Sequence, residues 1–235
     1  MEAYLEDHFD VIKFICDAAN HLEVSSQPKI LACMLYHQYV ALQKKFEEKC
    51  IEKFLVGATC LYLSAKIEEE PLKIRDLVNV CYRIHHSKNE PLEIGKMYWN
   101  LRDSITTCEL MLLRLFNFKT SFETPLKYLV HFMKLIHHWC NRCILNKANV
   151  YQICFNIMND LSYLPLICHY SPELLAASVI YTAFQVLALE VPRDINSKEW
   201  FEIFCPGTIE ENLQSISYEI LLLYEFDRNA YSREI

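Results

Sequence analysis

The chain has 235 residues, of which 52% are hydrophobic and only 3 are glycine. Average usage of roughly 7% would give about 16 glycines, and sheets with tight turns or phosphate-binding loops need that glycine, so the composition predicts an all-α protein. The formal net charge of −7 argues against a nucleic-acid-binding protein, because such a protein requires a basic face.

Apolar residues recur at helical spacing along most of the chain. They predict a short leading helix from about Phe9 to Ala19, which Ser25, Ser26 and Pro28 separate from the next one. Further helices are expected at about 30–46, 54–69, 74–85, 105–116, 126–140, 149–160, 172–189, 197–204 and 208–225.

Neither the start of the chain nor its longest charge-free run indicates export or membrane insertion. The first ten residues, MEAYLEDHFD, carry acids where a signal peptide has a basic and then an apolar stretch. The run from Leu174 to Leu189 is shorter than the roughly 20 residues needed to span a bilayer, so we expect a buried core helix there. We therefore expect an intracellular protein whose 11 cysteines are reduced thiols.

The two halves of the chain resemble each other. FLVGATCLYLSAK (54–66) and LLAASVIYTAFQV (174–186) carry small residues at the same offsets, and CELMLL (108–113) resembles YEILLL (218–223). Such self-similarity indicates a duplicated structural unit.

The repeat predicts two tandem five-helix domains preceded by a short N-terminal helix. The junction between the domains is expected near residues 141–148. We predict an N-terminal helix at 1–24, a first domain at 25–140 and a second domain at 141–235.

A lysine and a glutamate interrupt apolar helix faces in the first half. Lys66 ends a long run without formal charge and lies over Tyr62, one turn earlier on the same helix face. Glu109 falls in the apolar stripe between Ile105 and Leu112. Buried alone, each charge would cost several kcal/mol. Two arrangements fit this spacing equally well: the side chains form an ion pair, or each snorkels to solvent from a helix edge.

The second half does not repeat both charges. The same offset puts Val186 in the place of Lys66, whereas Glu219 matches Glu109. A charged pair that one copy has and the other lacks indicates a functional site rather than a scaffold.

One cysteine pair could in principle hold a metal or act in redox chemistry. HHWCNRC (137–143) contains a C-x-x-C beside two histidines, but Cys140 lies on an apolar helix stripe and there is no second C-x-x-C to complete a four-ligand zinc site. Redox C-x-x-C pairs accompany a βαβ pattern, which is absent. We predict that Cys140 and Cys143 bind no metal and form no disulfide.

The common catalytic motifs are missing from the sequence. It contains no glycine-rich phosphate loop, no H-E-x-x-H and no G-x-S-x-G. We therefore predict no catalytic residues, no cofactor and no enzymatic activity.

Two segments carry a resemblance to a known family. LSAKIEEEP (63–71) and CELMLLRLFNF (108–118) resemble the cyclin box, whose signature is a lysine on one helix and a glutamate on a later one. EPLEIGKMYWNLRDSI (90–105) is similar to transcription-type cyclins and, among them, to the cyclin-Q (cyclin M) subfamily. The resemblance covers about residues 8–235.

The resemblance implies a regulatory, activating subunit of a cyclin-dependent serine/threonine kinase, specifically cyclin-dependent kinase 10, in a heterodimer. Lys66 and Glu109 match the pair that holds the kinase backbone where it enters the αC helix. Ile67, Leu113 and Phe118 match apolar positions that pack on that helix. It also implies a location in the nucleus and the cytoplasm, with no nucleic-acid or membrane partner.

Two other functions remain as alternatives. The first is a tandem cyclin-fold transcription factor that binds nucleic acid, which the negative net charge disfavours. The second is a thiol- or metal-dependent helical enzyme built around Cys140 and Cys143, which metal analysis of the purified protein would detect.

Overall fold

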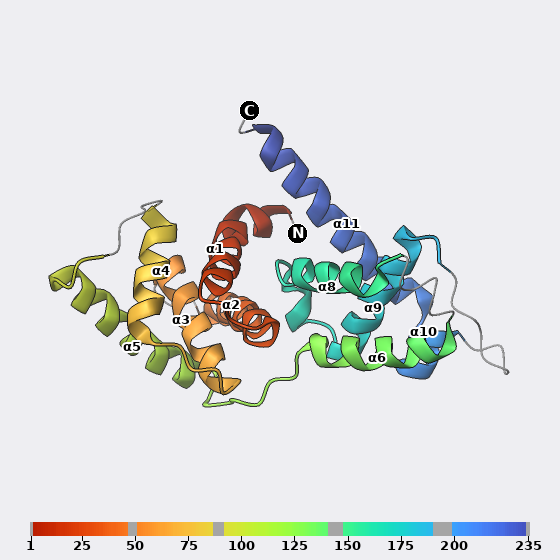
Figure 1. Ribbon diagram of the computed structural model, residues 1–235, viewed down its shortest axis with the longest axis horizontal. Helices are drawn as coiled ribbons and strands as arrows, with labels where there is room; N and C mark the ends of the chain where they lie inside the picture. The colour runs from red at the N-terminus through yellow and green to blue at the C-terminus, as the bar shows by residue number, and fades with distance from the viewer. Residues whose placement is uncertain (1, 47–50, 87–91, 141–147, 190–198, 234–235) are drawn as a thin grey trace. The chain divides into compact units, whose positions relative to one another are not determined.

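The computed structural model describes residues 2–46, 51–86, 92–140, 148–189 and 199–233, and its regular structure in these ranges is helical (Figure 1). The prediction of an all-α fold is confirmed for these residues. None of the described helices is long and apolar enough to cross a membrane. The helices are α1 (Glu2–His21), α2 (Ser26–Phe46), α3 (Lys53–Ile67), α4 (Ile74–His86), α5 (Lys96–Leu115), α6 (Pro125–Trp139), α8 (Val150–Leu161), the 3-10 turn η1 (Pro165–Cys168), α9 (Pro172–Val186), α10 (Trp200–Phe204) and α11 (Glu210–Arg233).

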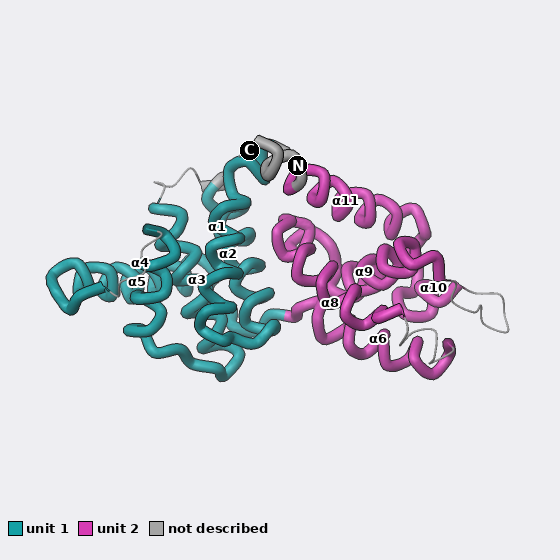
Figure 2. The backbone as a smooth tube through the Cα atoms, turned by 45° about the horizontal axis from the view of Figure 1, so that its top comes forward, with its two compact units in different colours: residues 1–122 teal, residues 123–235 magenta. Residues whose placement is uncertain are grey.

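The chain divides into two compact units, residues 1–122 and 123–235 (Figure 2). In the first unit, α3 is the central helix, and α1, α2, α4 and α5 all pack against it. Its sequence explains this place, because every residue from Val56 to Ala65 except Tyr62 is buried. Gly57 allows α1 to approach closely, since a Cβ atom there would lie 3.1 Å from Cγ1 of Val11.

The second unit repeats this plan around α9. Helices α6, α8, α10 and α11 pack against α9, which is buried from Leu175 to Phe184. The two central helices therefore correspond, and so do α5 and α11, which each pack on the central helix of their own unit. The predicted internal repeat is confirmed at the level of helix packing.

The caps of the two central helices fix how they align. The side chain of Glu52 accepts hydrogen bonds at the start of α3, and that of Ser171 does so at the start of α9. After each helix, one residue takes a left-handed conformation, Glu69 with φ 58° and Ala188 with φ 50°. When Glu52 is aligned with Ser171, Glu69 is aligned with Ala188.

The same register changes the predicted match for Lys66. In this register Thr59 corresponds to Ser178, and each hydroxyl donates to the backbone carbonyl four residues earlier, at 2.7 and 2.8 Å. Lys66 then corresponds to Gln185, one position before Val186. The sequence-based match of Lys66 with Val186 is therefore wrong by one residue.

The match for Glu109 also changes. The buried positions of α11 repeat those of α5 when Ser217 is aligned with Glu109: Ile105, Cys108, Glu109 and Leu112 on α5 correspond to Leu213, Ile216, Ser217 and Ile220 on α11. The sequence-based match with Glu219 is wrong, because Ser217 takes that place. The second unit therefore lacks both charges of the pair, not only the lysine.

The division of the chain differs from the predicted boundaries of 1–24, 25–140 and 141–235. Helix α1 packs on α2, α3 and α4 and so belongs to the first unit. Helix α6 packs on α9, and its apolar residues Leu129, Met133 and Ile136 are buried. Each unit still contains five α-helices among its described residues, but the boundary lies before α6 rather than after it.

Candidate partner-binding site at Lys66 and Glu109

The last turn of α3 and the middle of α5 bring Lys66 and Glu109 together. The Lys66 Nζ atom donates to Glu109 Oε1 at 2.7 Å and to Oε2 at 3.0 Å. Of the two arrangements that the sequence allowed, the ion pair is therefore the one that forms. Its two residues are far apart in the chain and meet because α3 packs against α5.

The pair lies at the surface of the first unit with one open side. The Lys66 side chain is 41% exposed and that of Glu109 is 11% exposed. The Lys66 ammonium also lies over the Tyr62 ring, 4.1 Å from its centroid, which is a cation–π geometry. An ammonium has three N–H donors, so Lys66 can hold Glu109 and still donate to a partner.

The charge of Lys66 is secured by its neighbour. Partial burial lowers the pKa of Lys66, but the hydrogen bond and negative charge of Glu109 more than offset this, so the pKa lies above its ordinary value. The ammonium therefore stays charged at neutral pH. Glu109 both fixes the position of the donor and keeps it a cation.

The acidic run after Lys66 helps to hold the end of α3. The Glu70 carboxylate accepts from the backbone N–H of Ser25 at 3.2 Å and from its hydroxyl at 2.7 Å. Gln27 donates to Glu68 at 3.5 Å. These bonds tie the segment after α3 to the start of α2, and so two of the three glutamates have structural partners.

The three apolar residues predicted to contact the kinase differ in exposure. Ile67 and Leu113 are half-buried, whereas the Phe118 side chain is 62% exposed. Phe118 follows α5 in a left-handed conformation with φ 55°, and its N–H donates to the Leu113 carbonyl at 2.7 Å. Leu110, which the sequence analysis did not select, is exposed one position after Glu109. The signal in the sequence is a leucine directly after Glu109 that falls outside the apolar stripe of Ile105 and Leu112.

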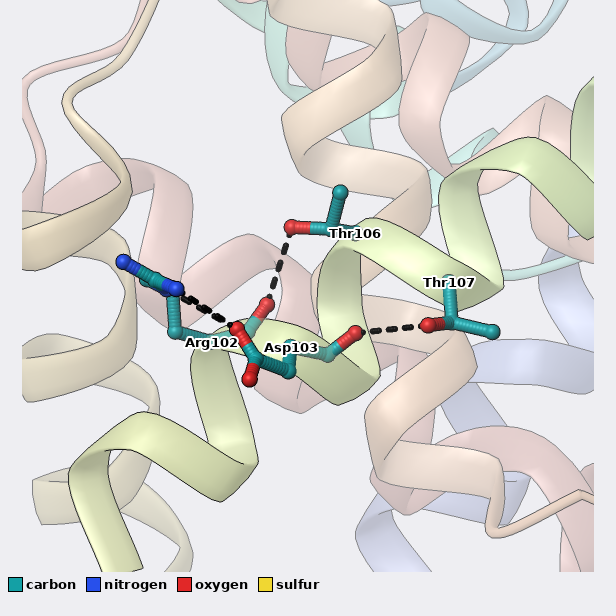
Figure 3. Close-up of polar contacts among 4 residues, drawn as sticks. All are labelled: Arg102, Asp103, Thr106 and Thr107. Carbon is teal, nitrogen blue, oxygen red and sulfur yellow. Dashed lines mark hydrogen bonds and ion pairs between the residues drawn. The ribbon is translucent and has the colours of Figure 1, made fainter. Parts of the chain in front are cut away.

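The two turns of α5 just before Glu109 carry the polar side chains of Arg102, Asp103, Thr106 and Thr107 (Figure 3). Arg102 donates from Nη2 to Asp103 Oδ1 at 2.8 Å, and its guanidinium lies 4.5 Å from the Trp99 ring centroid. The hydroxyls of Thr106 and Thr107 donate to the carbonyls of Arg102 and Asp103 at 3.0 and 2.8 Å. The helix thus satisfies these donors itself.

The predicted absence of a metal at Cys140 and Cys143 stays a prediction. Cys140 is half-buried where α6 ends, and Cys143 lies outside the described residues. Within the part of the chain that the structure describes, no three His, Cys, Asp or Glu residues are grouped to hold a metal ion.

Known proteins resemble this chain in sequence. Residues 8–121 match the family of the cyclin N-terminal domain. Cyclin-L2 of Mus musculus is 32% identical over 173 residues, which are 72% of this chain and 31% of that protein. Cyclin-L1 of Homo sapiens is 29% identical over 202 residues, which are 84% of this chain and 36% of that protein. The chain thus spans about a third of the length of these relatives.

Solved structures resemble it in fold. A chain in the crystal structure of the yeast RNA Pol II CTD kinase CTDK-1 complex has a TM-score of 0.69 at 18% identity, covering 94% of this chain and 66% of that chain. A chain in the structure of the CAK complex of Chaetomium thermophilum bound to ATP-gamma-S has a TM-score of 0.64 at 13% identity, covering 94% and 62%. Residues 8–121, which match the cyclin N-terminal domain family, make up nearly the whole of the first unit.

Proposed function

We propose that this protein is the regulatory subunit of a cyclin-dependent kinase, and that the site at Lys66 and Glu109 binds the kinase where its chain enters the αC helix. The observation that carries the proposal is the formed ion pair, whose lysine has a solvent-facing side. The pair lies within residues 8–121, which match the cyclin N-terminal domain family. A surface lysine that is fixed in place and flanked by apolar side chains suits a protein partner that offers backbone carbonyls beside an apolar helix.

The site supplies positioning and no chemistry of its own. Lys66 donates to carbonyl oxygens of the kinase, and Glu109 keeps the ammonium aimed at them. Ile67, Leu113 and Phe118 pack on the αC helix. A kinase transfers phosphate only when its αC glutamate pairs with its active-site lysine, so a protein that fixes αC activates the enzyme without touching the substrate.

We further propose that the chain is of the cyclin-Q type and that its kinase is cyclin-dependent kinase 10, in the nucleus and the cytoplasm. The support is the segment at 90–105, which is similar to that subfamily. The relatives described above are instead cyclin-L1 and cyclin-L2, so a different cyclin-dependent kinase is the competing assignment.

Reconstitution tests both levels of the proposal. The purified chain is mixed with separate cyclin-dependent kinases, and complex formation and peptide phosphorylation are measured. We expect a stable complex and activation with cyclin-dependent kinase 10. Activation of another family member alone would replace the partner but keep the function. If no cyclin-dependent kinase binds, the proposed function is wrong.

A further inference from the structure

The outer face of α11 in the second unit carries large apolar side chains between acidic ones. Tyr218 is 62% exposed and Leu221 is 47% exposed. Glu211 and Glu225 are also exposed and lie two turns before and after Tyr218. Residues seven apart share one side of a helix, so the four side chains lie along a single face. We call these four residues the α11 face.

The charged residues in the stretch that contains this face are acidic. From Glu199 to Asp227 the sequence contains acidic residues and no lysine or arginine, and Arg228 is the first basic residue after them. Tyr181 of α9 donates to Glu210, the first residue of the same helix, at 2.9 Å. An apolar strip within a negative potential attracts basic partners and repels acidic ones.

The α11 face corresponds to part of the site in the first unit. In the register given above, Tyr218 takes the place of Leu110 and Leu221 takes that of Leu113. The charged pair is absent, and Ser217, in the place of Glu109, is buried and bonded to the Thr182 hydroxyl at 2.7 Å. The second unit thus keeps the apolar half of the surface and lacks the fixed ammonium.

We propose that the α11 face binds a basic amphipathic helix of a protein partner. The partner helix places apolar side chains on Tyr218 and Leu221 and a lysine or arginine near Glu211 and near Glu225. At 1.5 Å per residue, the two glutamates are about 21 Å apart along the helix, so the partner needs about four turns. The proposal does not depend on the identity of the kinase.

Charge disfavours the other occupants. A second copy of the chain using the same face would bring glutamates against glutamates, and like charges across an interface reduce affinity. A nucleic acid or an anionic membrane would meet the same repulsion. A basic helix is the occupant that complements both the apolar centre and the acidic ends.

A synthetic probe tests the proposal on the full chain. The probe is a labelled 18-residue helix with leucines along one face at its centre and lysines near both ends. Its control has the same composition with the leucines spread around the helix. Fluorescence anisotropy measures the affinity of the chain for the probe and for the control. We expect the probe to bind at least roughly tenfold more tightly, because binding to the α11 face depends on the spacing of apolar side chains as well as on charge.

Two double variants localise the binding. Tyr218→Ser/Leu221→Ser should weaken the probe by roughly tenfold or more, since exposed apolar anchors carry most of such interfaces. Glu211→Lys/Glu225→Lys should weaken it too, and should gain affinity for a probe with glutamates at its ends. Glu6→Lys/Asp10→Lys, which changes two exposed acids of α1, gives the same net charge and should leave binding unchanged apart from a small general effect.

The outcome is decisive in either direction. Equal binding of probe and control, or binding that survives both α11 variants in folded protein, would overturn the proposal. Sedimentation tests whether the chain self-associates. If it does, and Tyr218→Ser/Leu221→Ser abolishes the self-association, the α11 face binds a second copy of the chain and the proposal is wrong.

Discussion

Lys66 is held at the surface by a carboxylate that is itself nearly buried. Glu109 accepts both of its described hydrogen bonds from Lys66, and the open side of the lysine leaves a path for water to reach the pair. The free protein can therefore solvate Glu109 if the lysine is lost. A bound partner would close that path, so the same substitution acts differently on folding and on binding.

We expect Lys66→Ala to lower the free energy of unfolding by about 1 kcal/mol, because Lys66 is partly exposed and water can reach Glu109 once the lysine is gone. In the complex it should reduce kinase affinity by roughly 30- to 3,000-fold, since truncating one partner of a dehydrated charge pair costs about 2–5 kcal/mol. Pulldown, calorimetry and thermal melts measure both effects.

The matched control is Gln185→Ala, at the corresponding position of the second unit. It should leave kinase binding unchanged. Wild-type affinity in folded Lys66→Ala protein would contradict the assigned site.

The buried cysteines should be chemically inert in the native protein. Burial raises the pKa of the Cys81 thiol to about 12 and that of Cys154 to about 12, so almost no reactive thiolate forms near neutral pH. Alkylation at pH 8 followed by peptide mapping should label these two sites only after unfolding. Labelling of native Cys81 at the rate of a free thiol would show that the first unit opens more readily than its packing indicates.

At the scale of the helices, Gly57 sets how closely α1 lies against α3. A Cβ atom at Gly57 would meet Val11 at 3.1 Å and Ile15 at 3.2 Å, so a larger side chain must push the helices apart. We expect Gly57→Val to lower the free energy of unfolding by about 1–3 kcal/mol, the usual effect of overpacking a core. Urea denaturation measures it. Gly95→Val serves as the control, because nothing lies closer than 4.0 Å to a Cβ atom there. Equal stability of the two variants would refute the close contact.

Helical periodicity located most helices but placed the start of α5 too late. The predicted helix begins near Ile105, whereas α5 begins at Lys96. The first turns of α5 expose Met97 and Trp99, so their apolar side chains do not fall on the buried stripe that periodicity detects. Because these large residues are exposed, a pattern that marks buried positions does not detect the first turns of α5.

Sequence similarity found the repeat but not its register. Matching small residues aligned Lys66 with Val186, whereas the caps align it with Gln185. The sequence alone left two arrangements for Lys66 and Glu109, an ion pair or two side chains that each reach solvent, because both arrangements require the same spacing. Deciding between them needs the packing of α3 on α5, which depends on the whole first unit.

At the scale of the whole molecule, the boundary between the units decides which fragment can fold. Residues 1–122 keep α1, which places Val11, Ile12 and Ile15 in the core with at most 2% exposure. A fragment of residues 25–140 lacks these side chains and carries α6 without α9. Small domains need nearly all of their buried surface to be stable, so neither loss is tolerable.

We therefore expect residues 1–122 alone to give a cooperative thermal transition and dispersed NMR spectra. Residues 25–140 should show neither. Residues 123–235, prepared in the same way, test whether the second unit is equally independent. Cooperative folding of 25–140 would restore the boundary suggested by the sequence.

The ion pair formed between Lys66 and Glu109 also affects how fast a partner can associate. A lysine side chain loses as much as about 2 kcal/mol of rotamer freedom when it is ordered. Here Glu109 orders the side chain during folding, before any partner arrives. Less of that entropy is then lost on encounter, and this surface needs no rearrangement to become competent. Any slow step in assembling the complex should therefore belong to the partner, whose own helix must move into place.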